Sequence, residues 1–582
     1  MNPLWRSRDL EMKPTEGPFP PLIGRILAAR GFTESQQVDR LLFPKLTELK
    51  EPVLLKGMDK AVQRLGEAAL KKEKICIYAD FDLDGTSGLA LLKTGMLALG
   101  FEDVIHYQPK RLSQGYGFHA EVVEELHQQG VTLIVTVDVG ITANPAVEKA
   151  QSLGVDVILT DHHLPGEILP PAYVIVNPNQ GRSDTSGLNY LCGAGVAFYL
   201  LRALKRYFFD HPTLPKNDFD LKEVLDFFTI ATLTDMVPLV DDNRVLVKHG
   251  LLKLAETQKP GLRALLQELG LEGRALTSQD VAIRFAPKLN ALSRMESGIL
   301  PIDLFLVNDA KTANEMVRQV LKNNSARVQL QGDAESEALE TLKTWTYKDF
   351  VFVASKNFHR GVVGLIATKL AQVYNQPAFV GSWGDDDVIV GSARLPQGQE
   401  ACLVEALGSA EKFLSRFGGH SAAAGFEVHA DKIEPLIAQL NAHFHTLREK
   451  PKPLEVFYDV EARLSDVGAP LMNWYDFVGP FGAGFTIPLI HFPKVLLHSK
   501  KALKGGHWRL KLVEPDGRGS HEALLFSPSP RHLEILEAGH PFLDVLGELQ
   551  WNYFAGQKSV QILVRDLKPS ADEVIANRGA GS

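Results

Sequence analysis

The sequence predicts an α/β protein with a parallel-sheet domain, a smaller second α/β domain joined to it by a long helix, and a β-rich C-terminal domain. From Lys74 onwards, short apolar, β-branched runs alternate with helix-like stretches, which is typical of a parallel sheet covered by helices on both faces. Residues 309–345 are polar, charged and helix-forming, and a second alternation of strands and helices follows them. Residues 455–567 look all-β, with short strands.

The first half of the chain is expected to hold one large domain. Residues 1–50 are rich in proline, with a helical patch at 22–30, and we expect them to form a leader that packs on this domain. The domain itself is expected over 51–308. Its predicted strands are residues 74–79, 131–137 and 155–160, and its predicted helices are 87–99, 143–153 and 221–235.

The second half is expected to hold two smaller domains, because 582 residues exceed what one hydrophobic core supports. The connecting helix 309–345 leads into an α/β domain over 346–448, and a Pro/Lys stretch at 449–453 indicates a linker. A β-rich domain is expected over 454–567, with a loose polar tail at 568–582. The predicted strands of the β-rich domain include 508–513, 521–526 and 560–564.

Composition and charge exclude several classes of protein. With 62 basic and 70 acidic residues the net charge is −8, so binding of a polyanion requires a local positive groove. The cysteines Cys76, Cys192 and Cys402 are far apart, which argues against a zinc site or a disulfide framework. The N-terminus lacks the apolar core of a signal peptide, and no apolar run reaches the ~20 residues of a membrane helix, so we expect a cytoplasmic protein.

Acidic and imidazole side chains follow three of the predicted strands. The motif ADFDLDG supplies Asp80, Asp82 and Asp84, TVDVGIT supplies Asp138, and TDHH supplies Asp161, His162 and His163. The carboxyl ends of parallel strands meet at one edge of a sheet, where ligands bind. We therefore expect these seven side chains to gather in one site.

A fourth part of this site is Asp235, near the end of a mostly apolar helix in the segment LTDMVPL. A carboxylate there opposes the helix dipole and is costly to bury unpaired, so a cation is expected beside it. Clustered carboxylates cannot all stay ionised without positive charge. Asp and His ligands together suit Mn²⁺ or Mg²⁺, and this number of ligands suffices for two ions, which can catalyse phosphoryl displacement.

Each motif taken alone is also compatible with a simpler role. A DxDxDG sequence occurs in calcium-binding loops, but the twelfth position from Asp80 is Leu91, where an EF-hand has Glu. A single Asp after a strand is usually a helix cap. The joint pattern, in order and at the strand ends, favours the metal site.

A sharper alternative is a haloacid-dehalogenase-type phosphatase, whose first motif is similar to DLDGT. In that case Asp82 is a covalent nucleophile, Asp84 is the general acid, and Asp241 and Asp242 form the later acidic motif. This alternative leaves Asp138 and the TDHH segment without a role.

The four motifs ADFDLDG, TVDVGIT, TDHH and LTDMVPL are similar, in order and spacing, to the signature motifs of the DHH phosphoesterase family. Within that family the chain resembles the RecJ-type exonucleases through PKRLSQGYGF, LCGAGVAF and APKLNALSRM. The segments HRGVVGLIATKL, GSAR and FGGHSAAAGF resemble the family's DHHA1 domain, and GGHWRLKL with LGELQWNYFAGQKSVQILVRD resembles its OB-fold. The resemblance covers about residues 20–567.

The resemblance implies a two-metal site, for Mn²⁺ or Mg²⁺, built from Asp82, Asp84, Asp138, His162 and Asp235. It implies that Asp138 bridges the ions, that Asp80 and Asp161 are near-site residues or additional ligands, and that His163 faces the scissile phosphate. Several DHH enzymes have a His four residues before the carboxylate equivalent to Asp82. This chain has Tyr78 there, which leaves the coordination of the first metal open.

The resemblance also implies contacts to the substrate. The segments GSAR and FGGHSAAAGF combine glycines, which admit an anion close to backbone N–H groups, with an Ala-rich stretch that we expect to start a helix. The residues implied to hold a 5′-terminal phosphate are Ser392, Arg394, Gly418, Gly419 and His420, with Arg111 opposite. A loop-like segment with Lys288, Asn290 and Arg294 would line the route of the strand.

A basic stretch in the OB-like region is expected to bind a single strand without sequence preference, because it combines cations with an aromatic stacking platform. Its expected contact residues are Lys500, Lys501, Lys504, Trp508 and Arg509. The alternative is a solvated loop beside a core tryptophan.

Together these features predict a single-stranded-DNA-specific 5′-to-3′ exonuclease that releases 5′-mononucleotides in DNA repair and recombination. One alternative is a DHH phosphodiesterase for short oligonucleotides or cyclic dinucleotides, although such enzymes usually lack the OB-like region. Another is a non-catalytic single-strand-binding scaffold, which the intact acidic motifs disfavour. The resemblance suggests a single-stranded-DNA-binding protein and a RecQ-type helicase as partners.

Overall fold

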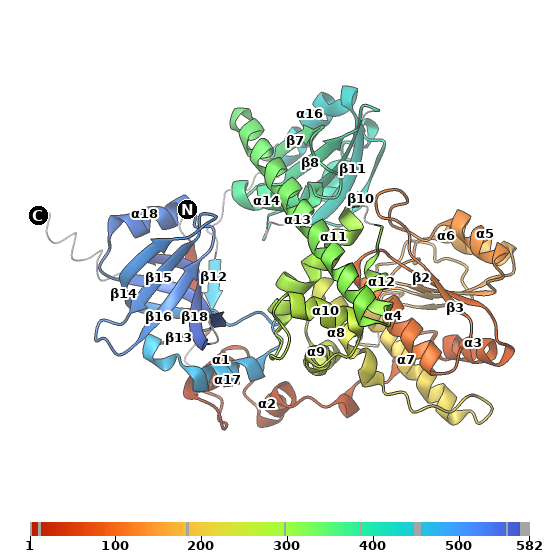
Figure 1. Ribbon diagram of the computed structural model, residues 1–582. Coiled ribbons are helices and arrows are strands. Elements are labelled where there is room, and N and C mark those ends of the chain that lie inside the picture. The colour runs from red at the N-terminus through yellow and green to blue at the C-terminus, as the bar shows by residue number, and fades with distance from the viewer. Residues whose placement is uncertain are drawn as a thin grey trace, which may run out of the picture. The chain divides into compact units, whose positions relative to one another are not determined.

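The computed structural model in Figure 1 describes residues 3–9, 13–181, 186–295, 298–384, 386–396, 398–399, 401–446, 455–554 and 557–570. The chain divides into two compact units. The terminal unit comprises residues 1–50, 238–248 and 452–582, and the central unit comprises 51–237 and 249–451.

A five-stranded parallel sheet forms the first part of the central unit, in the order β3-β2-β4-β5-β6. Its strands are β2 (Ile75–Ala79), β3 (Val104–Tyr107), β4 (Leu133–Val137), β5 (Asp156–Thr160) and β6 (Val174–Val176). The three predicted strands are confirmed as β2, β4 and β5. Sequence analysis missed β3 and β6, which have only four and three residues. The chain crosses from β3 back over β2 to β4, so the strand order reverses at the β2/β4 edge, where ligands bind in such sheets.

Helices cover both faces of this sheet. Helix α4 (Leu83–Ala98) begins four residues earlier than predicted and is buried along most of its length between the sheet and helices α7 (Gly193–Asp210) and α8 (Leu225–Thr234). Helices α5 (Ala120–Gln128) and α6 (Asn144–Ser152) share a core with alternate strand residues such as Cys76 and Ile134. Helix α3 (Met58–Lys71) packs on α7.

Further helices lead to the second α/β part of the central unit. They are α10 (Pro260–Glu268), α11 (Ala286–Arg294), α12 (Pro301–Leu306) and α13 (Ala310–Thr341). Before them, α9 (Asp241–Ala255) begins in residues assigned to the terminal unit and ends in residues assigned to the central unit. The long connecting helix is confirmed as α13, with 32 residues. The segment with Lys288, Asn290 and Arg294 was wrongly predicted to be loop-like: it is helix α11, whose early proline fits a first helical turn.

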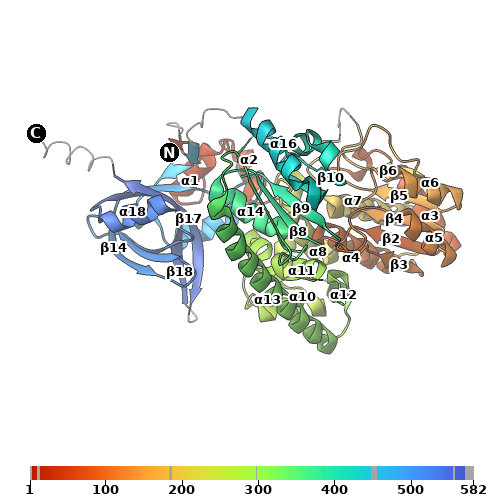
Figure 2. The ribbon, with the colours of Figure 1, turned by 90° about the horizontal axis from the view of Figure 1, so that it is seen from above.

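The second α/β part has a mixed sheet in the order β10-β11-β9-β8-β7. Figure 2 shows β8, β9 and β10 of this sheet with helix α16. Its elements are β7 (Val351–Ser355), α14 (Val363–Tyr374), β8 (Ala378–Trp383), β9 (Val388–Arg394), α15 (Leu403–Gly408), β10 (Arg416–Gly419), β11 (Ala423–His429) and α16 (Ile433–Thr446). The Ala-rich stretch after FGGH was wrongly expected to start a helix. It forms strand β11, because Ala424, Phe426 and Val428 alternate into the core and this packing outweighs the helix propensity of alanine.

The terminal unit contains a six-stranded barrel in which β14 pairs with both β15 and β17. Its strands are β13 (Val460–Glu461), β14 (Ile490–Ala502), β15 (Trp508–Val513), β16 (Ser520–Leu525), β17 (Leu543–Phe554) and β18 (Gln557–Pro569). The expectation that this region is all-β was wrong in one respect. Two helices, α17 (Ala469–Val478) and α18 (Pro530–Ala538), also belong to it.

The N-terminal leader packs in the terminal unit and not, as predicted, on the first domain. Strand β1 (Leu4–Ser7) pairs in parallel with β12 (Glu455–Tyr458), and α1 (Pro21–Ala29) and α2 (Ser35–Leu42) contribute to the core beneath the barrel. Local sequence does not reveal this pairing, because its partner lies about 450 residues away in the chain. The predicted linker 449–453 and residues 571–582 of the predicted tail lie outside the described residues. No helix in the described ranges is both long and apolar enough to cross a membrane.

Candidate metal centre and anion cavity

The loop after β2 brings three carboxylates to the edge of the sheet. Asp80 directly follows the strand, and Asp82 caps α4, since its Oδ1 accepts hydrogen bonds from the N–H groups of Asp84 (2.8 Å) and Gly85 (3.1 Å). Asp138 follows β4 with a left-handed backbone (φ 62°), which Asp tolerates better than most residues. Because β2, β4 and β5 are neighbours, the carboxylates meet where the strand order reverses.

The N-terminus of α7 fixes Asp84. The N–H groups of Gly193 and Ala194 donate to its two carboxylate oxygens at 2.6 and 2.8 Å, an arrangement that favours the ionised form. A side chain at Gly193 would place its Cβ only 2.3 Å from the Cβ of Asp138. The segment LCGAGVAF therefore requires glycine here so that α7 can approach two carboxylates closely.

Six of the predicted ligands lie close enough to hold divalent cations. Among the described residues, three groups have ligand atoms within 4.8 Å of one another: Asp84, His162 and Asp235; Asp80, Asp82 and Asp138; and Asp138, His162 and His163. The Nε2 atom of His162 lies 3.2 Å from Asp138 Oδ1 and 3.7 Å from Asp235 Oδ2. Asp80 Oδ1, Asp138 Oδ1 and Asp235 Oδ2 are buried without a hydrogen-bond partner in the described part of the chain, so the donor set fits bound cations.

The electrostatics of this cluster also indicate missing positive charge. Burial, followed by repulsion from neighbouring carboxylates, raises the pKa of Asp80 to about 7 and that of Asp235 to about 6. The same causes raise the pKa values of Asp84 and Asp138 well above their ordinary value. Burial and the charge of His163 lower the pKa of His162 to about 4, so this imidazole is neutral near pH 7 and keeps a lone pair for a metal.

Asp161 belongs to none of these groups of ligands and instead orients the two histidines. Its Oδ1 accepts from the backbone N–H of His162 (2.7 Å), the backbone N–H of His163 (3.1 Å) and His163 Nδ1 (2.8 Å), while Oδ2 accepts from Ile141 N–H (3.0 Å). Burial of His163 opposes its protonation, but the hydrogen bond and charge of Asp161, with the charges of Asp235 and Asp84, raise its pKa to about 9. Asp161 thus holds a cationic imidazole beside the carboxylates.

Tyr78 lies among aromatic side chains and not among the ligand groups. It is fully buried, stacks on Tyr107, meets Phe118 edge-on, and donates from its hydroxyl to the carbonyl of Gly117 at 3.0 Å. It therefore anchors the segment PKRLSQGYGF to the sheet. Tyr116 of the same segment lies with its hydroxyl 3.3 Å from His163 Nδ1.

Four arginines from separate segments of the chain meet in a second feature, which we call the arginine cavity. This cavity of about 240 Å³ is lined by Arg111, Leu112, Arg294, Arg360, Gly361, Val363, Gly364, Val390, Gly391, Ser392 and Arg394. Burial, with repulsion from Arg111, Arg327 and Arg394, lowers the pKa of Arg294 to about 9. In the described ranges no carboxylate pairs with Arg111, Arg294 or Arg394, so the cavity suits an anion.

The other predicted contacts lie in several places. Lys288 and Asn290 share helix α11 with Arg294 but do not line the arginine cavity. Gly418 and Gly419 end β10, and the ring of His420 lies parallel to that of His163, with the centroids 6.5 Å apart.

In the barrel of the terminal unit, Lys501 pairs across the strands with Arg509, and both side chains are exposed, as is Lys504. Lys500 donates to the carbonyl of Leu536, and Trp508 is half-buried against the barrel core. Lys501, Lys504 and Arg509 are therefore the residues of the predicted patch whose charged groups are free to contact a strand.

Three residues that no sequence pattern predicted, Gln108, Asn177 and Asn179, support the backbone of the site residues. The amide of Gln108 donates to the carbonyl of Asp80 (2.5 Å) and to Thr86 Oγ1 (2.9 Å). The side-chain amides of Asn177 and Asn179 donate to the backbone carbonyls of His163 and His162. No sequence pattern separates these side-chain amides from other Gln and Asn residues. The only signal is that they follow β3 and β6, two strands that were not predicted.

Comparisons with known proteins agree with this geometry. Family models described as the DHH family N-terminal domain, the DHHA1 domain and the RecJ OB domain match residues 74–232, 348–446 and 458–566. The single-stranded-DNA-specific exonuclease RecJ of Escherichia coli strain K12 is 30% identical over 95% of this chain and 96% of its own. RecJ of Bacillus subtilis is 29% identical over 96% of this chain and 69% of its own.

The fold is also similar to solved structures. The crystal structure of RecJ in complex with Mn²⁺ from Thermus thermophilus is similar with a TM-score of 0.78 and 28% identity, over 98% of this chain and 80% of that chain. A second structure from the same source, with Mg²⁺, gives a TM-score of 0.71 and 26% identity over 98% of this chain and 79% of that chain.

Proposed function

The chain belongs to the RecJ family of single-stranded-DNA-specific exonucleases, and we infer from this that it is a metal-dependent hydrolase that cleaves the phosphodiester bonds of single-stranded DNA. Its cofactors are divalent cations, Mn²⁺ or Mg²⁺. One observation supports this function most directly: within the described residues, buried carboxylate oxygens without hydrogen-bond partners lie together at the sheet edge. The arginine cavity in the same unit is consistent with it.

We propose that Asp84, His162 and Asp235 would hold one cation and that Asp80 and Asp82 would hold the other, with Asp138 able to contribute to either group. When bound, the two cations would supply an activated water and neutralise charge on the scissile phosphate. His162 contributes a neutral imidazole. His163, kept protonated by Asp161, is placed to donate a hydrogen bond to a phosphate oxygen as negative charge develops there.

The arginine cavity would set the polarity of the reaction. Arg111, Arg294 and Arg394, with Ser392, offer guanidinium and hydroxyl donors to a 5′-terminal phosphate. Arg111 lies near the metal edge, with its guanidinium carbon 5.0 Å from the ring centroid of Phe81. Burial lowers the pKa of Arg111, and the charges of Asp82 and Asp80 partly oppose this effect. A strand held by its terminal phosphate then presents its first phosphodiester to the metals, so a 5′-mononucleotide leaves and the next phosphate takes its place.

We further propose that Lys501, Lys504 and Arg509, with the edge of Trp508 and the stem of Lys500, hold the strand on the barrel. Such a surface binds a backbone without reading its sequence. We also propose, from the family, a role in DNA repair and recombination, a cytoplasmic location, and partnership with a single-stranded-DNA-binding protein and a RecQ-type helicase. Co-purification with each candidate partner tests the last of these.

The test is digestion of oligonucleotides labelled at either end, with Mn²⁺, with Mg²⁺ and with EDTA. Single-stranded and duplex DNA and RNA are compared, with Asp138→Ala as the control. We expect metal-dependent release of mononucleotides from the 5′ end of single-stranded DNA, and no release by the variant. Cleavage of only very short oligonucleotides or cyclic dinucleotides would favour a different DHH phosphodiesterase. Tight binding without cleavage in either metal would point to a scaffold.

A further inference from the structure

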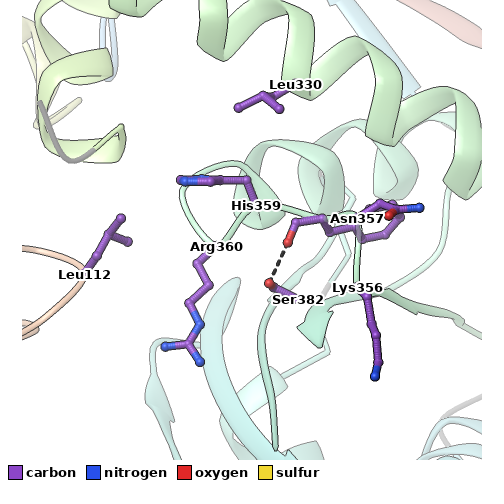
Figure 3. Close-up of a pocket in the computed structure, with 8 residues that line it drawn as sticks. Leu112, Leu330, Lys356, Asn357, His359, Arg360 and Ser382 are labelled. Atoms are coloured by element: carbon purple, nitrogen blue, oxygen red, sulfur yellow. Dashed lines mark hydrogen bonds between the residues drawn. The ribbon is translucent and has the colours of Figure 1, made fainter. Parts of the chain in front are cut away.

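A second cavity adjoins the arginine cavity on the side of α13. We call it the lysine cavity. It has a volume of about 420 Å³ and is lined by Leu112, Leu330, Lys356, Asn357, Phe358, His359, Arg360 and Ser382. Leu112 and Arg360 line both cavities, so the two are adjacent. Figure 3 shows Arg360 and Lys356 extending on either side of Ser382, whose hydroxyl donates to the carbonyl of Phe358 at 2.5 Å.

The positive charge of the two cavities exceeds what one terminal phosphate requires. The arginine cavity contains four guanidinium groups, those of Arg111, Arg294, Arg360 and Arg394. A terminal phosphate monoester carries only about 1.5 to 2 negative charges at neutral pH. The lysine cavity adds the exposed Lys356, and its lining residue Asn357 donates to Glu337 Oε2 at 3.1 Å. Within the described residues no carboxylate lies within ion-pair distance of Lys356 or Arg360. Unpaired cations repel one another, so this surplus favours a ligand with more negative charge.

The order of the two cavities indicates where the additional charge would lie. Arg111 lies near Asp80 and Asp82 and lines the arginine cavity, but it does not line the lysine cavity. None of the proposed metal ligands lines the lysine cavity either. A terminal nucleotide that reaches from the metals to the arginine cavity therefore has the lysine cavity beyond its 5′-phosphate. That space is available to groups attached to this phosphate.

We propose that the lysine cavity binds the outer phosphates of a 5′-polyphosphate end, so that the protein removes a terminal nucleotide that carries a 5′-triphosphate. This inference rests on the proposed exonuclease function. In the reaction, the oxygen of water bonds to the phosphorus of the first internucleotide phosphodiester, and the bond from that phosphorus to the 3′ oxygen breaks. The 3′ oxygen takes a proton, a nucleoside 5′-triphosphate leaves, and the remaining strand begins with a 5′-phosphate.

Oligonucleotides of one sequence with a 5′-hydroxyl, a 5′-monophosphate or a 5′-triphosphate test this with the full-length protein and Mn²⁺. The first product is identified by anion-exchange chromatography. We expect a nucleoside 5′-triphosphate from the triphosphorylated strand, with kcat/KM within about threefold of that for the monophosphorylated strand. Cleavage of the monophosphorylated strand alone, or release of a nucleoside monophosphate as the first product from the triphosphorylated strand, would overturn the proposal.

Two charge-reversal variants, one inside the lysine cavity and one outside it, test the role of this cavity. Lys356→Glu changes an exposed side chain of the lysine cavity, and Lys412→Glu changes an exposed lysine of the same domain that lines neither cavity. We expect Lys356→Glu to lower kcat/KM for the triphosphorylated strand by about tenfold more than for the monophosphorylated strand, and Lys412→Glu to affect both equally. An equal effect of Lys356→Glu on both strands would refute the assignment. If the wild type cleaves neither strand, the exonuclease function itself fails and the inference fails with it.

Discussion

The substitution Asp161→Asn would separate the orientation of His163 from the binding of metal. Oδ1 of Asp161 accepts three N–H groups from the two histidines, and Oδ2 accepts the N–H of Ile141. An asparagine can replace only one of these oxygens. If it keeps the three contacts to the histidines, its amide must face the Ile141 N–H as donor against donor.

Asp161→Asn should affect both the stability of the protein and the pKa of His163. The buried donor pair should lower the free energy of unfolding by about 1–3 kcal/mol. Loss of the carboxylate charge removes the main cause of the raised pKa of His163, so that pKa should fall from about 9 to its ordinary 6.5 or below, because burial then dominates. At pH 8 the protonated share of His163 then drops from roughly nine tenths to about three hundredths, and kcat should fall by about 30-fold.

The assay is kcat for single-stranded DNA as a function of pH at saturating Mn²⁺. Since the protonated imidazole is the active form, activity falls as pH rises through its pKa, and this decline should move from near pH 9 to near pH 6.5 in the variant. Asp226→Asn is the matched control, because Asp226 is equally buried and accepts hydrogen bonds from Thr257 and Lys259 outside the site. A loss of stability in both variants with an unchanged kcat profile in Asp161→Asn would refute the reasoning.

Three further predictions concern other groups. Gln108→Leu should leave the buried carbonyl of Asp80 and the hydroxyl of Thr86 without a donor, lowering stability by about 1–3 kcal/mol and Mn²⁺ affinity by about tenfold, as measured by thermal unfolding and calorimetry. Mn²⁺ affinity should rise from pH 5 to pH 8, because the carboxyls of Asp235 and Asp80, with pKa values of about 6 and 7, must lose protons before they bind the ion. Calorimetry in buffers of different ionisation heats measures the protons released, and no release would contradict this prediction. Burial alone would raise the pKa of Asp566, but hydrogen bonds from His532 and Trp5 outweigh burial and lower that pKa. Asp566→Asn should therefore lower the free energy of unfolding at pH 7. Urea unfolding should show the difference between variant and wild type shrinking as pH falls below 4.

Local patterns in the sequence were sufficient to locate much of the metal centre. Strands β2, β4 and β5 are buried on both faces, so they appear as short apolar runs, and the acidic motifs after them mark their carboxyl ends. In a parallel sheet those ends meet at one edge, which is why a linear pattern predicts a three-dimensional cluster. The long helix α13 was predictable for a similar reason, since its polar helical pattern extends over 32 residues.

Only the tertiary structure decided which residues support this site and what lies beside it. The arginine cavity joins Arg111 after β3, Arg294 of α11 and Arg394 of β9. The family resemblance implied that Arg111 lies opposite Arg394, but no local pattern in the three segments predicts that Arg294 joins them. The strand β11, predicted as a helix, and the leader, predicted on the wrong domain, are errors of the same kind. Local propensity differs by at most about 0.7 kcal/mol among ordinary residues, whereas burial of an apolar side chain against a distant partner contributes about 1.5–3 kcal/mol, so long-range packing decides such positions.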